Sequence, residues 1–263
     1  MIISIYNRKG GAGRTTTAMA LASAIAADDV DVEVLDAAPN NDCGEWAAEA
    51  ADSGTPLPFA VELANSATID ALCRTAKGDA EKFLIIDYPR DSYPVNAVYE
   101  SSDLVILPTT TNRMDIQATF ETLNELGYHG KDSNAIAAGC MVLLNRIERD
   151  ACSGRPVPTL SELIERHHLE NPDARYFQAD IAWSDELSQK YGSPFDGELY
   201  GYEGVWAEIK RALRIQLLPR KKKSVTFWLA ADEKEELTAL AKRRGKTVSQ
   251  ILREGISAIE RGE

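Results

Sequence analysis

A glycine-rich stretch near the N-terminus constrains the fold of this chain more than any other segment. Residues 8–16 read Arg-Lys-Gly-Gly-Ala-Gly-Arg-Thr-Thr, and they lie between the apolar run 2–6 and the alanine-rich run 17–27. A glycine-rich turn between a strand and a helix directs backbone N–H groups at one point, at the positive end of the helix dipole. The pattern therefore predicts an anion site of the kind that holds the phosphates of a nucleotide.

Apolar strand-like runs alternate with amphipathic helical stretches along the rest of the first 219 residues. Some strand-like runs, such as 83–86, are apolar at every position, which is typical of strands covered on both faces. We expect an α/β fold, with a mainly parallel sheet covered by helices on both faces. The expected strands are 2–6, 32–36, 83–87, 104–108, 140–145 and, with a weaker pattern, 176–181, and the expected helices are 15–27, 67–77, 115–126, 159–168 and 204–217.

Charge is distributed unevenly along the chain. The net charge is −12, yet residues 220–263 contain 11 Lys and Arg against 7 Asp and Glu and contribute +4, so the preceding residues carry −16. This asymmetry indicates an acidic body and a basic tail. We predict a body of residues 1–218, a basic linker of residues 219–223 and a small domain of residues 224–263.

Several classes of protein are disfavoured by composition. No run approaches the roughly 18–20 apolar residues of a membrane span, and the N-terminus has no signal-peptide pattern, so we expect a cytoplasmic protein without a membrane partner. The four cysteines are far apart in sequence, which favours free thiols over a disulfide framework or a metal site. They are Cys43, Cys73, Cys140 and Cys152.

Four segments resemble motifs of one superfamily. Residues 9–15 resemble the deviant Walker A motif, K-G-G-x-G-K-[ST], of the ParA/MinD superfamily. Residues 32–40 are similar to its switch segment, 83–89 to its Walker B strand and 103–109 to the strand that follows. The resemblance covers roughly residues 1–218 and implies a P-loop fold that binds ATP or ADP with Mg2+. A glycine-rich turn without a ligand is the alternative.

The resemblance implies roles for individual residues. The Thr15 hydroxyl would coordinate Mg2+ and Asp87 would hold a metal-bound water. Lys9 would reach across a two-fold interface to the partner's nucleotide, and so tie ATP binding to homodimer formation. Asn145, followed by Arg146, would face the adenine. The implied nucleotide-binding residues are Lys9, Gly10, Gly11, Ala12, Gly13, Arg14, Thr15, Thr16, Asn145 and Arg146, and the implied catalytic residues are Lys9, Arg14, Asp36 and Asp87.

Two positions depart from the superfamily pattern. Arg14 replaces the phosphate-binding lysine, and a planar guanidinium is not equivalent to a compact ammonium in a tight loop. Ala38 lacks the carboxylate of the second switch aspartate, and losing one such element can cost about 10²–10³-fold in rate. We therefore expect slow or impaired hydrolysis. For Asp36 and Asp87 the alternative interpretation is a strand-end carboxylate that caps a helix.

The basic tail has a pattern of its own. Residues 224–229 alternate polar and apolar side chains with a period of two. We expect an amphipathic helix over residues 232–244 and a second helix that begins near Thr247, after Gly245. One strand and two helices in about 40 residues bury too little apolar surface to be stable alone. The tail is therefore expected to dimerise.

The same tail resembles a ribbon-helix-helix DNA-binding domain of the MetJ/Arc/CopG type. In that fold, paired strands from two chains enter the major groove of DNA, and helix N-termini contact phosphates. Trp228 departs from the usual polar base reader, and it could instead be buried against the body. A dimerisation arm without DNA binding is the alternative for the whole tail. The expected DNA-binding residues are Lys223, Ser224, Thr226, Trp228, Thr247, Val248 and Ser249.

Together the two parts predict a partition protein. We expect a homodimer that pairs through both the nucleotide face and the C-terminal ribbon, binds DNA through residues 220–263, and works with a further plasmid-encoded partner protein. The main hypothesis is ATP-controlled DNA segregation. The alternatives are a conjugative-transfer ParA relative that binds DNA near a transfer origin, and a nucleotide-sensing transcriptional repressor.

Overall fold

The computed structural model describes most of the first 213 residues. The described residues are 1–65, 68–77, 82–89, 98, 100–129, 139–149, 156–157, 162, 176–213 and 240. The chain divides into two units, Met1–Gln216 and Leu217–Glu263. Within the second unit only Leu240 is described, so the expected ribbon-helix-helix domain and its DNA-binding residues lie outside the described residues and stay predictions.

The described part of the body contains one sheet with strand order β3-β2-β4-β1-β5-β6-β7, and β8 pairs with β6. The pairings are parallel except that of β6 with β7. The strands are β1 Ile2–Ile5, β2 Asp31–Asp36, β3 Ala60–Leu63, β4 Lys82–Asp87, β5 Leu104–Thr109, β6 Cys140–Arg149, β7 Pro156–Val157 and β8 Ile181–Ala182. The helices are α1 Arg14–Ala27, α2 Asp42–Asp52, α3 Ile69–Lys77, α5 Arg113–His129, α8 Asp185–Ser188 and α9 Tyr202–Ala212.

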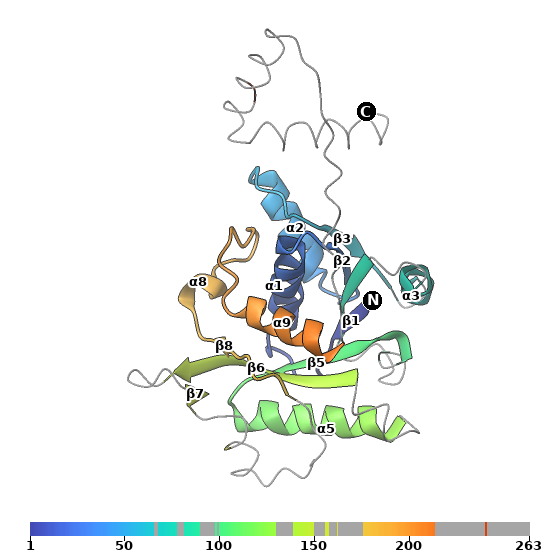
Figure 1. Ribbon diagram of the computed structural model, residues 1–263, viewed down its shortest axis with the longest axis vertical. Helices are drawn as coiled ribbons and strands as arrows, with labels where there is room; N and C mark the ends of the chain where they lie inside the picture. Colours follow the sequence, from blue (N-terminus) through green and yellow to red (C-terminus); the bar gives the residue numbers. More distant parts are fainter. Residues whose placement is uncertain are drawn as a thin grey trace. The chain divides into compact units, whose positions relative to one another are not determined.

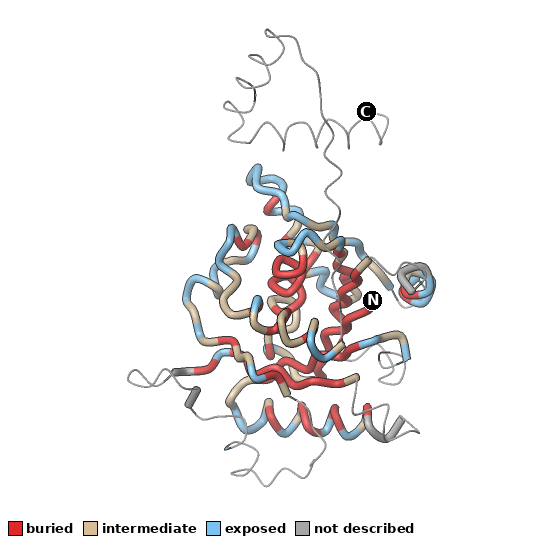
Figure 2. The backbone as a smooth tube through the Cα atoms, viewed as in Figure 1, coloured by how far each residue is buried: buried red, intermediate tan, exposed pale blue. Residues whose placement is uncertain are grey.

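Helices cover both faces of this sheet, which confirms the expected fold class (Figure 1). Alternate strand residues enter two different cores, because successive side chains of a strand point to opposite faces. Ile3 and Ile85 pack in the core that contains α1 and α9, whereas Leu84 and Ile86 pack in the core that contains residues of α3 and α5. Figure 2 shows the resulting continuous buried layer along the sheet and α1.

Most expected elements are found close to their expected positions, with differences at the sheet edge. The expected strand 176–181 is an isolated bridge from Tyr176 to Val142, followed by the short strand β8. The expected helix 204–217 begins earlier, at Tyr202, because Gly201 has φ 96° and ends the preceding turn. Residues beyond 213 lie outside the described part of the chain, as does the expected helix 159–168 apart from Glu162.

Four elements, α2, β3, β7 and α8, were not expected from the sequence. β3 is an edge strand in which three of four residues are exposed, so its sequence lacks the apolar pattern from which the central strands were predicted. α2 contains Gly44 and a polar face, and it buries Cys43 and Trp46 against the core of α1. The formation of α2 and β3 depends on tertiary packing more than on local sequence.

Other compositional expectations can be compared with the described residues. Cys43, Cys73 and Cys140 are buried free thiols, as expected, and Cys152 lies outside the described residues. In the part of the body that the structure describes, no helix has the length and apolar character needed to cross a membrane.

Trp206 of α9 provides a direct test of this packing. It is 2% exposed, packs edge-on against Phe83, and donates a hydrogen bond from Nε1 to Asp28 Oδ2 at 2.8 Å. Trp206→Ala is expected to lower the free energy of unfolding by about 3–5 kcal/mol, because it leaves a cavity between α9 and the sheet. Urea denaturation followed by circular dichroism measures the loss.

Trp183→Ala is the matched control, since this tryptophan is 53% exposed. It should change the free energy of unfolding by less than about 1 kcal/mol. Equal losses in the two variants would contradict the placement of Trp206 in the core.

Candidate functional site

The glycine loop, residues 8–16, connects β1 to α1 at the carboxyl edge of the parallel strands. Gly11 and Gly13 have φ of 80° and 90°, a left-handed conformation that glycine adopts without strain. Gly13 is also the N-cap of α1, and no side chain of the described residues caps the N-terminus of this helix. The first N–H groups of α1 therefore suit an external anion such as a phosphate.

Asp87 ends β4 directly beneath this loop. Its side chain is 1% exposed, Thr15 Oγ1 donates to its Oδ2 at 2.7 Å, and Cys43 Sγ lies 3.7 Å from the same oxygen. Burial raises the pKa of Asp87 to about 6, and the Thr15 hydrogen bond and the Arg14 charge oppose that rise. The structure thus brings together Thr15 and Asp87, the two residues expected to hold Mg2+.

Arg14 is folded back toward the same carboxylate. Its Nη1 donates to the Asn7 carbonyl at 2.6 Å, and its Nε lies 3.7 Å from Asp87 Oδ1. Neither Arg14 Nε nor Asp87 Oδ1 has a hydrogen-bond partner among the described residues. The Thr15 and Asp87 oxygens are donors of the type Mg2+ takes, but a permanent positive charge beside the free carboxylate oxygen does not fit a dication there.

Asp36 ends β2 next to Asp87 in the strand register. Its Oδ2 accepts hydrogen bonds from the amides of Cys43 at 2.8 Å and Gly44 at 3.0 Å, and its Oδ1 accepts from the amide of Ala38 at 3.0 Å. Burial raises its pKa, and these amides oppose the rise. Asp36 thus accepts hydrogen bonds from the first turn of α2, as the capping alternative expects, and its catalytic role stays a prediction.

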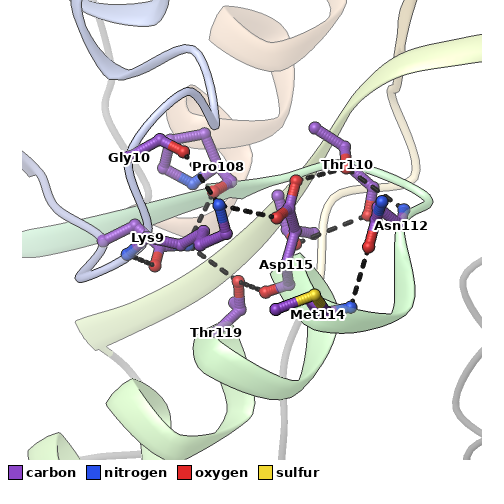
Figure 3. Close-up of polar contacts among 10 residues, drawn as sticks. Lys9, Gly10, Pro108, Thr110, Asn112, Met114, Asp115 and Thr119 are labelled. Atoms are coloured by element: carbon purple, nitrogen blue, oxygen red, sulfur yellow. Dashed lines mark hydrogen bonds and ion pairs between the residues drawn. The ribbon is translucent and has the colours of Figure 1, made fainter.

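Lys9 lies on the other side of the loop, beside the first turn of α5 (Figure 3). Its Nζ is 3.5 Å from Asp115 Oδ1, and its side chain is 39% exposed. Asp115 Oδ2 accepts a hydrogen bond from Thr110 Oγ1 at 2.6 Å, which fixes the carboxylate. Asp115 was not among the expected site residues, although an acidic residue in a first helical turn is a recognisable signal.

Asn7 holds the loop to the neighbouring strand and helix. Its Nδ2 donates to the Pro108 carbonyl at 2.8 Å and to Thr119 Oγ1 at 2.7 Å, while its Oδ1 accepts from the Lys9 amide at 2.9 Å. Asn7 is fully buried, so these bonds satisfy polar groups that would otherwise be costly. They fix the start of the glycine loop and with it the position of Lys9.

Asn145 of β6 contacts the loop from the opposite side. Its Nδ2 donates to the Ala12 carbonyl at 3.1 Å and to Thr17 Oγ1 at 3.3 Å, and Thr17 also hydrogen-bonds Tyr202 Oη at 3.0 Å. Because the Ala12 carbonyl can only accept a hydrogen bond, the amide nitrogen of Asn145 must face it, and Asn145 Oδ1 takes part in neither of these bonds. This oxygen is buried and has no hydrogen-bond partner within the part of the chain that the structure describes.

A cavity of about 180 Å³ opens beside Asn145 and Gly13. Arg146, with φ 56°, places its guanidinium 5.9 Å from the ring centroid of Trp183, a second residue of the cavity wall. The dimensions and aromatic lining suit a planar ring. Thr16, Asn145 and Arg146 were expected near a nucleotide, whereas Trp183 and Tyr202 come from a distant part of the sequence and were not.

Comparison with known proteins places this geometry in a family. The family model described as "VirC1 protein" matches residues 1–152, more than half of the chain. The chain belongs to the VirC1 family. This assignment and the fold agree with the resemblance of the sequence to the ParA/MinD superfamily.

Individual relatives of this VirC1-family chain are distant. It is 30% identical over 125 residues to maintenance of carboxysome distribution protein A of Gloeobacter kilaueensis, a match covering 47% of the chain and 55% of that protein. It is 27% identical over 124 residues to protein virC1 of Rhizobium radiobacter, covering 46% of the chain and 54% of the relative. The chain thus spans about half the length of the curated relatives it matches.

Solved structures share the fold of the VirC1-family body. MinD from Aquifex aeolicus superposes with a TM-score of 0.58 at 14% identity, covering 84% of this chain and 99% of that one. The Cyanothece McdA(D38A)–ATP complex has a TM-score of 0.57 at 19% identity, covering 82% and 97%. A putative plasmid partition protein from Borrelia burgdorferi B31 bound to AMPPNP has a TM-score of 0.57 at 14% identity, covering 80% and 98%.

The raised pKa of Asp87 predicts a specific pH dependence of stability. The folded protein holds the Asp87 proton more tightly than the unfolded chain, so stability is lost as pH rises from about 4 through about 6. Asp87→Asn removes this titration. Relative to Asp87→Asn, the wild type should lose about 2–3 kcal/mol of unfolding free energy between pH 4 and pH 7.

Urea denaturation of the VirC1-family chain across this pH range measures the difference. Asp52→Asn, at an exposed position near the end of α2, is the matched control and should parallel the wild type. Parallel profiles for the wild type and Asp87→Asn would show that the buried carboxylate does not titrate as described.

Proposed function

We propose that this chain is a ParA-like DNA partition or positioning protein in which ATP or ADP controls the pairing of two bodies on DNA. One observation carries the nucleotide assignment. The glycine loop at the N-terminus of α1 has a buried acceptor, Asn145 Oδ1, on one side and the Thr15–Asp87 pair on the other. These groups match the base, the phosphates and the reacting end of one nucleotide.

The similar structures support a nucleotide as the ligand. The Cyanothece protein is described as an ATP complex, the Borrelia protein as bound to AMPPNP, and MinD from Pyrococcus horikoshii OT3 as complexed with Mg-ADP. In this chain the glycine loop lies at the carboxyl edge of the parallel strands, where α/β proteins bind ligands. The curated relative that maintains carboxysome distribution favours a positioning role.

The orientation of the Asn145 amide favours adenine over guanine. Its nitrogen is held by Ala12 and Thr17, so only the oxygen is available to a base. The exocyclic amino group of adenine can donate to this oxygen, whereas the keto oxygen of guanine would meet another acceptor. A buried acceptor left without a donor costs about 1–3 kcal/mol.

We infer that Lys9 serves association with a second chain. In the single chain its ammonium faces Asp115 at 3.5 Å and is partly exposed, so the contact holds it only weakly. A partner's nucleotide, with several phosphate charges, is a stronger acceptor than one carboxylate. Binding of ATP at a two-fold interface would thus draw Lys9 away from Asp115 and join the two bodies.

Hydrolysis in this proposal is slow. Ala38 has no carboxylate to orient a water, and its amide is instead used by Asp36. Arg14 is directed at the Asn7 carbonyl and Asp87 and has replaced the usual phosphate-binding lysine. Bound ATP therefore keeps two chains associated for a long time, and its slow hydrolysis ends the association.

The basic tail completes the proposal. Residues 220–263, with a charge of +4 against −16 in the preceding residues, would supply the DNA contacts, because the acidic body repels phosphates. Footprinting distinguishes the possible roles. Protection of a separate repeat array supports partition, protection beside a transfer origin supports conjugative transfer, and protection only within the chain's own promoter supports repression.

Asp115→Asn tests the role assigned to Lys9. Asn retains an acceptor for Thr110 but removes the charge that holds Lys9, so a non-hydrolysable ATP analogue should dimerise this variant roughly two- to fivefold more tightly. Sedimentation equilibrium measures the dimer constant. Glu121→Gln, the same charge change at an exposed position of α5, is the matched control. Association no tighter than in that control would reject the role.

Two substitutions in the tail test DNA recognition by the intact chain. Thr226→Ala should weaken binding to the protected sequence by about 1–3 kcal/mol while sparing unrelated DNA, because it removes a base contact. Lys223→Gln should weaken both and lower the salt dependence of binding by about one charge for each tail. Fluorescence anisotropy with both DNAs is the measurement. If neither variant differs from the wild type, the tail is a dimerisation arm only.

A further inference from the structure

The charge balance around Asp87 is unusual for a site expected to take a divalent cation. Asp87 Oδ1 and Arg14 Nε are both buried and lie 3.7 Å apart, and neither has a hydrogen-bond partner in the described ranges of the body. The Arg14 side chain is 18% exposed, so its charge acts on the carboxylate with little screening by water. The one carboxylate oxygen left for a metal ion therefore already faces a cation.

This cation is permanent. A guanidinium does not lose its proton in proteins, whereas an ammonium in the same position can. Thr15, the second expected metal ligand, donates a hydrogen bond from its hydroxyl to Asp87 Oδ2 at 2.7 Å. A dication entering here would have to displace the Thr15 hydrogen bond and approach a fixed positive charge at close range.

The position of Arg14 also leaves it available to a nucleotide. It is the first residue of α1, directly after Gly13, so it lies where the loop and the helix N-terminus meet a phosphate. One Nη1 hydrogen is used by the Asn7 carbonyl and Nε faces Asp87. The remaining N–H groups of its fork can bond phosphate oxygens, for which a guanidinium is well suited.

We propose that Arg14 supplies the positive charge that a divalent cation provides in related sites, so that this chain binds nucleoside diphosphates and triphosphates with little dependence on Mg2+. The inference rests on the proposed nucleotide site and concerns the regulation of that same site. A bridge from Asp87 through the guanidinium to the phosphates replaces a bridge through a metal ion. Nucleotide affinity is then set by the chain itself and not by the divalent cation concentration.

The experiment measures binding of a fluorescent ADP analogue to the intact chain, by anisotropy, in excess Mg2+ and in EDTA. The wild-type dissociation constant should change less than about threefold between the two conditions. Arg14→Lys, which introduces the superfamily's residue, should bind at least about tenfold more weakly in EDTA than in Mg2+. Arg211→Lys makes the same exchange at an exposed position of α9 and should behave as the wild type.

The possible outcomes separate the inference from the proposed function. Wild-type binding that weakens about tenfold or more in EDTA overturns the role of Arg14 but leaves the nucleotide site standing. Absence of binding in both conditions overturns the nucleotide site itself. If Arg14→Lys does not fold, the wild-type comparison still decides, because low Mg2+ dependence is the property inferred.

Discussion

The left-handed backbone at Gly11 and Gly13 is the constraint on which the rest of the site depends. It turns the chain from β1 into α1 within a few residues and leaves the first turn of α1 without a side-chain cap. A Cβ at Gly13 would lie 2.9 Å from Asn145 Nδ2, so glycine also permits β6 to approach the loop. Glycine at these positions is therefore required both for the anion site at the N-terminus of α1 and for the cavity beside Asn145.

The site contains two buried carboxylates that differ in their hydrogen-bond partners. Asp87 and Asp36 end neighbouring parallel strands, yet one carboxylate is satisfied by backbone amides and the other is left facing Arg14. Lys9, outside this pair, is partly exposed, and its Nζ lies 3.5 Å from Asp115 Oδ1 and 3.5 Å from the Gly10 carbonyl. A nucleotide would meet a fixed cation inside the site and a releasable one at its edge. This difference between the two cations suits a protein that responds to nucleotide binding by forming a dimer.

The sequence predicted the strands and the loop well, because central parallel strands are apolar on both faces and the glycine spacing is restrictive. It missed the short elements β7 and α8 as well as α2 and β3, and the formation of α2 and β3 depends on packing. Asp115 and Trp183 were missed for a different reason: they lie near the loop or Asn145 through contacts between residues far apart in sequence. Asp36 was expected in catalysis, and its observed partners are the amides of α2.

The central claim is that the glycine loop, Asn145 and Asp87 form an adenine nucleotide site. Isothermal titration calorimetry of the intact chain with ATP and with GTP tests it most directly. We predict saturable binding of one ATP per chain, at least about tenfold tighter than GTP, because Asn145 Oδ1 can accept from the exocyclic amino group of adenine but would face the keto oxygen at the same ring position of guanine. Equal affinity for the two nucleotides, or no binding of either, would contradict it.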